Sequence, residues 1–241
     1  MDIQNSYWLK LTLLSDAALG RGDGVAGLVD AEVQHDAYGL PYLSGKTLKG
    51  LLTATCAEIL NALQQAQLSQ YADWETSARR LFGSPGSLTA ALGLMRVGDA
   101  RLPDALRQAT AYEVERERGY WQREDVLASL TALRRQTAMD PVTGAPKKET
   151  LRTVRVILRG ISLAARLDFA DEKPSPTDLA LLAACCKGLR RAGTERNRGR
   201  GRLRVALYDQ DPFVHPEARP VTGKAFAPLK AALQPQEKEA G

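Results

Sequence analysis

The feature that most limits the possible folds is a strand–helix–strand pattern that occurs twice along the chain. Each copy has a strand of alternating apolar residues, a helix with an apolar stripe, and a further strand. The first copy lies within residues 7–100 and the second within residues 154–207. Two such copies in one chain predict an α+β domain of the ferredoxin-like (RRM-like) type, with a split βαβ arrangement. The predicted elements are a strand at 7–13, a helix at 44–63, a strand at 92–100, a β segment at 154–169, a helix at 174–189 and a strand at 202–207.

Two insertions separate these elements. Residues 15–43 are rich in glycine and aspartate, and residues 101–152 break the regular alternation. A connection of this length inside a domain is usually functional or disordered. We therefore predict one domain over residues 1–210 with these two insertions, followed by a proline-rich, meandering extension over residues 211–241.

The second insertion predicts a β-hairpin that protrudes from the domain. Leu127, Leu130 and Leu133 share one face of a short predicted helix, and a turn-rich tip follows at 136–148. Arginines in the next β segment give the hairpin a basic root. The apolar phase of that segment shifts near Gly160, which predicts a β-bulge there.

Composition narrows the functional classes. The chain has 241 residues and a net charge of +5, and its arginines cluster at 134–159 and 190–204. No apolar run is long enough to span a bilayer, and the N-terminus does not resemble a signal peptide, so we expect a cytoplasmic protein without a membrane partner. The two histidines and three cysteines have no metal-ligand spacing, and no nucleophile triad or Walker loop is present.

One arginine cluster coincides with glycines that let a backbone come close to a ligand. Within residues 193–202, Gly193, Gly199 and Gly201 alternate with arginines. Glycine accepts positive φ angles, and the arginine fork matches phosphate oxygens. This segment, called here the Arg–Gly loop, predicts either a polyanion-binding loop or a solvated basic turn. Its candidate ligands are Arg196, Arg198, Gly199, Arg200, Gly201 and Arg202.

A second candidate anion site lies at the start of the first helix. Ser44 is the expected N-cap. The first turn presents free N–H groups and the positive end of the helix dipole, and Lys46 and Lys49 add charge. Ser44, Lys46, Thr47 and Lys49 are therefore candidate phosphate ligands. The alternative is an ordinary helix with two solvated lysines.

Several motifs, taken in order, resemble one protein family. They are Gly20-Arg21-Gly22, Gly27-Leu28-Val29-Asp30, the stretch from Gly39 to Gly50, Arg80-Leu81-Phe82-Gly83, and the Arg–Gly loop. Over residues 7–207 the chain is similar to the RAMP superfamily, and more narrowly to the repeated backbone subunit of type III CRISPR effector complexes. It departs from that pattern at Ser44-Gly45-Lys46-Thr47, where the family more often has Pro-Gly-Ser-Ser, and in the polar stretch 101–150.

The resemblance implies how such a subunit binds RNA. Other RAMP subunits would stack with it into a filament along a guide RNA, whose phosphates lie against the two candidate anion sites. The hairpin would be a thumb that inserts across the duplex of guide and target RNA and kinks it. The alternative is a tip that is simply mobile. The thumb residues are Met139, Val142, Lys147 and Arg152, with Met139, Val142 and Pro146 as candidate apolar wedges.

The resemblance also implies a catalytic aspartate, Asp30, which cleaves target RNA beside the thumb. A carboxylate accepts the proton of the adjacent 2′-hydroxyl or holds a hydrated divalent cation, here Mg²⁺. Glu32 and Asp36 are competing carboxylates, and His35 is either a proton donor or a surface residue.

Two other functions stay open at this point. One is a non-catalytic, RNA-binding structural subunit of the same kind of complex, including an end-capping RAMP subunit that holds the 5′ handle of the guide. The other is a stand-alone ribonuclease that processes guides, which the scarcity of histidines disfavours.

Overall fold

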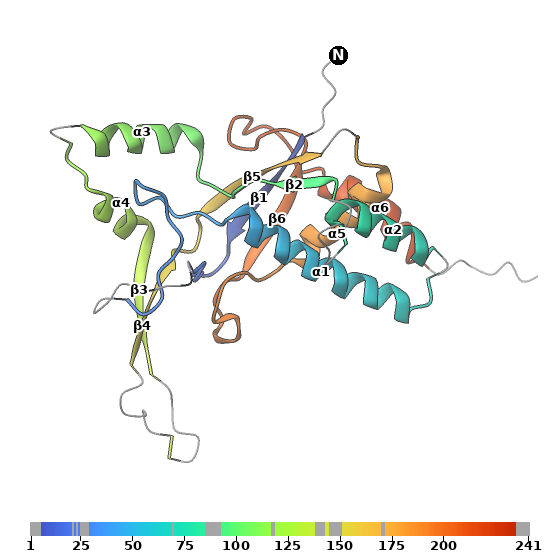
Figure 1. Ribbon diagram of the computed structural model, residues 1–241, viewed down its shortest axis with the longest axis horizontal. Coiled ribbons are helices and arrows are strands. Elements are labelled where there is room, and N and C mark those ends of the chain that lie inside the picture. The colour runs from blue at the N-terminus through green and yellow to red at the C-terminus, as the bar shows by residue number, and fades with distance from the viewer. Residues whose placement is uncertain are drawn as a thin grey trace, which may run out of the picture.

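The chain forms a four-stranded sheet with helices against one face and a separate two-stranded hairpin (Figure 1). The computed structural model describes residues 6–20, 22, 24, 29–68, 70–84, 93–116, 119–137, 143–144, 151–169 and 172–234. Of the predicted thumb residues, Arg152 lies within these ranges. Met139, Val142, Pro146 and Lys147 lie outside them, so their predicted roles stay predictions.

The main sheet has the strand order expected of the two sequence copies. It consists of β1 (Ser6–Leu13), β2 (Met95–Val97), β5 (Ser162–Phe169) and β6 (Leu203–Tyr208). The order is β2-β5-β1-β6, and every neighbouring pair is antiparallel. This is the pairing of a split βαβ arrangement, so the α+β class and the antiparallel sheet are confirmed.

Alternation along β1 explains which face of the sheet is buried. Leu9, Leu11 and Leu13 are almost fully buried, whereas Trp8 and Lys10 on the opposite face are half-buried. Each fully buried leucine contributes roughly 2 kcal/mol relative to an exposed one. The covering helices are α1 (Gly45–Gln65), α2 (Tyr71–Phe82), α5 (Pro176–Gly188) and α6 (Thr222–Ala232), and all of them contribute to the same hydrophobic core.

Side-chain caps fix the starts of the two central helices. Ser44 is extended (φ −62°, ψ 143°) and its Oγ accepts from the N–H of Thr47, as the sequence predicts. Ser175 and Asp178 form a reciprocal capping box at the start of α5. The buried Asp178 carboxylate also accepts from Ser77 Oγ at 2.6 Å, which ties α2 to α5. These hydrogen bonds therefore define the first residues of α1 and α5.

The second insertion contains a hairpin, as predicted, but its helices differ from the expectation. The hairpin consists of β3 (Thr131–Gln136) and β4 (Arg152–Ile157) and projects away from the main sheet (Figure 1). It follows α3 (Asp104–Glu115), which the sequence did not predict, and α4 (Arg123–Leu130). Leu133 lies on β3 opposite Arg155, so placing it on a helix was wrong. Pairing with β4 overrides the helical spacing of the leucines.

The predicted bulge near Gly160 is also wrong. Gly160 has φ 89° and lies in a turn between β4 and β5, which belong to different sheets. The apolar phase changes because the chain leaves the hairpin and enters the main sheet. A real bulge occurs elsewhere, since Gly98 N donates to Arg166 O and Arg101 N donates to Ala164 O, leaving residues 99–100 opposite Ala165.

The C-terminal extension is more regular than predicted. It includes α6, which packs on α5, and Val221 N donates to Leu207 O at 2.8 Å. Residues 235–241 lie outside the described part of the chain. None of the described helices is long and apolar enough to cross a membrane.

Candidate nucleic-acid interface

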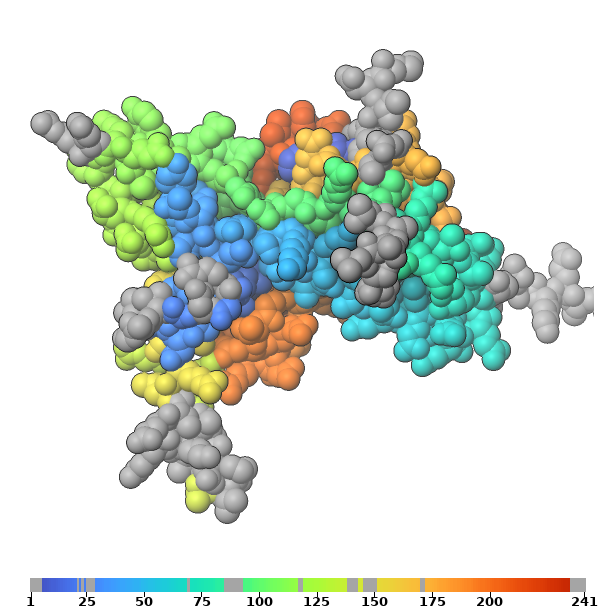
Figure 2. Space-filling model, viewed as in Figure 1, coloured from blue at the N-terminus to red at the C-terminus, as the bar shows by residue number. Residues whose placement is uncertain are grey.

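The Gly/Asp-rich segment 15–43 joins the hairpin to the Arg–Gly loop. Ala17 bridges to Ile157 of β4, Ala18 bridges to Thr194, and Ala31 runs parallel to Val154. On the face shown in Figure 2, the described part of this blue segment lies between the yellow hairpin root and the orange Arg–Gly loop. The described part of the insertion is therefore a packed connector that brings two basic elements together.

Positive φ angles shape the Arg–Gly loop. Gly193, Gly199 and Gly201 have φ values of 87°, 78° and 70°, and a short 3₁₀ turn spans Arg196–Arg198. A Cβ on Gly201 would lie 1.9 Å from the carbonyl oxygen of Ala192. The glycines predicted to take left-handed conformations do so, and Gly201 also permits a close backbone approach.

Alanine at Gly201 is expected to destabilise the protein more than alanine at Gly199. Both substitutions place a side chain at positive φ, which costs about 1 kcal/mol. At Gly201 the new Cβ must also push Ala192 away, for a total of about 3 kcal/mol, whereas no described atom lies within 4 Å of a Cβ on Gly199. Urea unfolding of both variants measures this difference, and equal losses would contradict it.

The loop is bonded to the hairpin through a polar network. Arg198 donates to Gln136 Oε1 on β3 at 2.6 Å, and Gln136 in turn donates to Glu195. Glu195 also pairs with Arg200, so the charge of Arg200 is largely neutralised within the loop. Arg196, Arg198 and Arg202 are exposed and are the loop cations that face solvent.

Asp16 supports the same junction from the connector segment. Arg134 of β3 donates to Asp16 Oδ2 through Nη2 at 2.7 Å and through Nε at 3.1 Å. The N–H of Arg159 donates to the other carboxylate oxygen at 3.2 Å. Partial burial raises the pKa of Asp16, but these hydrogen bonds and the two arginine charges outweigh burial and lower it. Asp16 therefore holds the hairpin as an anion at neutral pH.

Asp30 lies beside β4, near the outer end of the hairpin strands, where Thr153 pairs with Arg135. Its N–H donates to Thr153 O at 2.8 Å, and Thr153 N donates to Asp30 Oδ2 at 2.6 Å. The residue is exposed. These two bonds fix the carboxylate beside β4 while its other side faces solvent, so it is positioned to meet a ligand that crosses the hairpin.

The other acidic candidates have structural partners. Glu32 is only 3% exposed and pairs with Arg155 Nε at 2.9 Å. Asp36 Oδ1 accepts from the N–H groups of Tyr38 and Leu40, which closes a local turn. His35 Nδ1 lies 3.0 Å from the carbonyl oxygen of Asp36. Asp30 is thus the carboxylate of this group that is both exposed and bonded to the hairpin.

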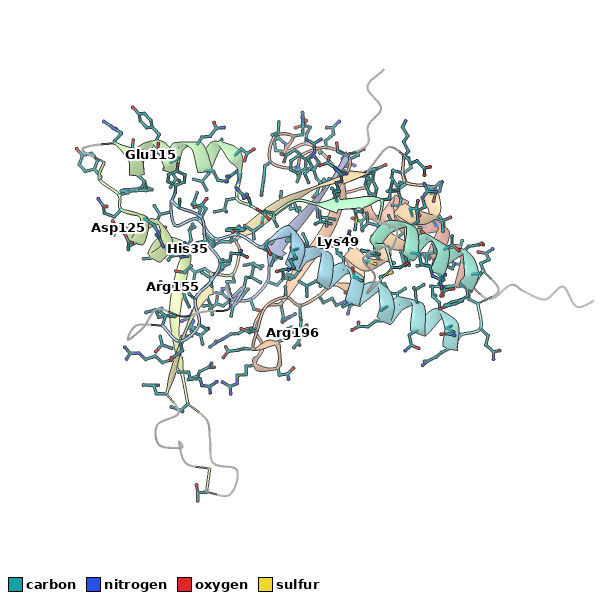
Figure 3. All side chains as sticks on the ribbon, in the orientation of Figure 1. His35, Lys49, Glu115, Asp125, Arg155 and Arg196 are labelled. Atoms are coloured by element: carbon teal, nitrogen blue, oxygen red, sulfur yellow. The ribbon has the colours of Figure 1, made fainter. Side chains whose placement is uncertain are left out.

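The start of α1 is a weaker anion site than its sequence suggests. The N–H of Gly45 donates to Asp99 Oδ1 at 2.9 Å, so an internal carboxylate already occupies that amide. Lys49 Nζ donates to Met95 O at 3.0 Å, and burial lowers its pKa. Lys46 and Thr47 are exposed. Figure 3 shows Lys49 on α1, apart from Arg155 at the hairpin and Arg196 on its loop.

Sequence reasoning missed part of the interface. Arg134, Gln136 and Thr153 position the Arg–Gly loop and Asp30, yet they were absent from the candidate site residues. The basic root of the hairpin was the signal that pointed to them. In the described ranges, no group of three or more His, Cys, Asp or Glu side chains is arranged to hold a metal ion.

Comparison with known proteins assigns the family. The family model described as "RAMP superfamily" matches residues 10–204. The chain belongs to the RAMP superfamily. The match covers most of both strand–helix–strand copies of this RAMP protein, together with the connector segment, the hairpin and the Arg–Gly loop. No curated protein matches it in sequence.

Solved structures show the same fold. The RAMP protein is similar to a chain of the type III-B Cmr-beta apo state, with a TM-score of 0.56 and 11% identity over 85% of this chain and 97% of that chain. It is also similar to a chain of type III-B Cmr-beta bound to cognate target RNA, with a TM-score of 0.57 and 13% identity over 84% and 96% of the two chains. At these identities the likeness shows the fold alone.

Proposed function

We propose that this RAMP protein is a subunit of a type III CRISPR effector complex, which binds the phosphates of a guide RNA and cleaves paired target RNA at Asp30. The observation that carries the proposal is that Asp30 and the Arg–Gly loop both contact the same part of the hairpin. Asp30 is bonded to Thr153 on β4, and Arg198 is bonded to Gln136 on β3 of the same hairpin. The structural likeness to a Cmr-beta chain solved with cognate target RNA supports the choice of RNA as ligand.

Cleavage of a target RNA beside Asp30 needs a proton acceptor and an aligned ribose. In the proposed reaction, the Asp30 carboxylate accepts the proton of the 2′-hydroxyl as that oxygen attacks the adjacent phosphorus. The P–O5′ bond breaks and the leaving oxygen takes up a proton, giving a 2′,3′-cyclic phosphate and a 5′-hydroxyl. The hairpin, with Arg152 opposite Gln136 at the outer end of its strands and the predicted wedge residues in the segment that connects them, would kink the target into the in-line geometry.

A divalent cation is the second way in which Asp30 would act. Mg²⁺ is bound by one or two carboxylates together with substrate phosphates and waters, rather than by an all-protein cage. One exposed carboxylate, with no group of three or more acidic, His or Cys ligands around it in the described ranges, fits that kind of site. When bound, the cation would neutralise charge that develops on the phosphate, and Asp30 would orient it.

The guide would follow the basic elements without being read by sequence. Arg196, Arg198 and Arg202 on the loop would contact phosphates, and Lys46 and Thr47 at the start of α1 would extend the path. Phosphate contacts set position and affinity but carry no base information. Ser44 serves chiefly as the cap of α1, and Lys49 reaches this path only by leaving Met95.

A second candidate function is a structural or end-capping subunit that binds RNA without cutting it. One observation favours it: Asp30 already makes two hydrogen bonds to Thr153, which is the arrangement of an aspartate that holds a connector segment in place. The two candidates share the RNA interface and differ only in what Asp30 does.

Replacing Arg196 and Arg198 together with alanine is expected to weaken single-stranded RNA binding about tenfold or more. Each lost phosphate contact should also reduce the slope of log K against log salt by about 0.7. Filter binding across a salt series measures both quantities. The matched control replaces Arg79 and Arg116, two exposed arginines that pair with Glu75 and Glu113, and it removes the same net charge. Equal losses in both double variants would show that net charge, and not the loop, determines the affinity.

A further inference from the structure

A cavity lies on the face of the sheet that the core helices leave uncovered. Its volume is about 170 Å³, and Trp8 and Ala164 belong to the part of its lining that the sheet contributes. The bulge at residues 99–100, just after the end of β2, interrupts the pairing of this segment with β5. Leu102 and the first turn of α3 form one wall, and Phe213 from the segment after β6 forms another. The cavity is therefore built from four separated parts of the chain.

The charges around this cavity balance one another. Arg101 pairs with Asp99 at 2.6 Å, and Arg107 pairs with Asp104 at 2.7 Å. Arg166, a third lining arginine, pairs with Asp168 at 2.7 Å. A free anion would meet carboxylates as well as guanidinium groups here, so this cavity differs from the Arg–Gly loop. A neutral group that offers both donors and acceptors fits such a lining better than a phosphate does.

One polar atom of the lining residues lacks a partner. Arg107 Nε is buried and has no hydrogen-bond acceptor among the described residues. A buried donor without an acceptor costs about 1–3 kcal/mol, so a ligand that supplies an acceptor oxygen or nitrogen is favoured. The aromatic rings of Trp8 and Phe213 add flat apolar surface beside this donor. Lys10 lies 5.4 Å from the centre of the Phe213 ring and helps to hold that ring over the sheet.

We propose that this cavity binds one unpaired nucleobase of a single-stranded RNA. The base would lie against Trp8 and Phe213, its acceptor edge would face Arg107 Nε, and its N–H groups would face the neighbouring carboxylates. Unpaired RNA bases are bound in this way, by stacking on aromatic rings and by hydrogen bonds to their edges. The inference rests on the proposed function only in taking RNA as the polymer, because the cavity shares none of its lining residues with the Arg–Gly loop or the hairpin.

Photo-crosslinking of the full-length chain tests the proposal. With an oligouridylate that carries 5-iodouridine, crosslinks are expected on the peptides that contain Trp8 and Phe213. Phe213→Ala and Arg107→Gln should each lower the yield about tenfold, as expected for the loss of stacking on one base or of one hydrogen bond to a charged group. Arg116→Gln is the matched control, because Arg116 also lies near α3 and pairs with an acid three residues earlier. If Phe213→Ala fails to fold, Arg107→Gln carries the test, because the Arg107 side chain is partly exposed and lies outside the hydrophobic core.

The outcomes separate this inference from the proposed function. Crosslinks confined to the hairpin and the Arg–Gly loop, with yields unchanged in Arg107→Gln, would overturn the nucleobase cavity and leave the proposed function standing. If the wild-type chain binds no RNA, the proposed function fails, and crosslinking of free 5-iodouridine monophosphate at Trp8 still decides whether the cavity binds a base.

Discussion

Target RNA is expected to remain intact when Asp30 is replaced with alanine in an effector complex assembled with its guide. Loss of a positioned proton acceptor lowers a cleavage rate by about 10²- to 10⁴-fold. Guide binding should stay within about twofold of the wild type, because the exposed arginines proposed to contact phosphates lie on a different segment. A time course with end-labelled target RNA measures the rate, and a filter-binding assay on the same samples measures retention of the RNA.

Asp30→Asn is the control that separates chemistry from structure. Asparagine still presents a carbonyl oxygen to the N–H of Thr153, so it keeps the hydrogen bond that Asp30 Oδ2 makes at 2.6 Å. It accepts no proton at neutral pH. If Asp30→Asn cleaves at the wild-type rate, the carboxylate is not the proton acceptor. If neither the wild type nor any variant cleaves, the structural or end-capping function is correct.

Replacing Glu32 with alanine is expected to destabilise the protein by about 3–5 kcal/mol. Glu32 is 3% exposed, and its partner Arg155 also donates to Thr131 Oγ1. Removing the carboxylate leaves a guanidinium charge in a largely buried site without compensation, which is the costly way to break such a pair. Urea unfolding followed by circular dichroism measures the loss in the free energy of unfolding.

A double variant distinguishes an uncompensated charge from a lost contact. Glu32→Leu together with Arg155→Met removes both charges and keeps similar volume, so it should recover most of the stability. A loss below about 1 kcal/mol in Glu32→Ala would contradict the buried pair. RNA cleavage by the double variant should persist as long as Asp30 keeps its bonds to Thr153, because Glu32 has no part in the proposed chemistry.

Local patterns predicted the sheet and its central helices well. The alternation of Leu9, Leu11 and Leu13 and the cap at Ser44 depend on neighbours within a few residues, and the structure contains both. The left-handed glycines of the Arg–Gly loop were equally accessible, because glycine adopts positive φ angles with less strain than other residues.

Long-range pairing decided what local patterns did not predict. Leu133 has helical spacing from Leu127, yet β3 pairs with β4, and the change of phase near Gly160 marks a change of sheet. Likewise, no spacing rule connects Glu32 to Arg155 or Lys49 to Met95. These partners are close only in the folded chain, so the sequence left Glu32 as a candidate acid and Lys49 as a candidate phosphate ligand.

The bond between Arg198 and Gln136 has a mechanical consequence. Since it joins the Arg–Gly loop to a strand of the projecting hairpin, a sideways pull on that hairpin acts as torque on the loop as well. The hairpin and the Arg–Gly loop therefore move together as long as this bond is kept. Under the proposed function, a target strand that bends the hairpin would therefore also exert force on the loop that contacts the guide.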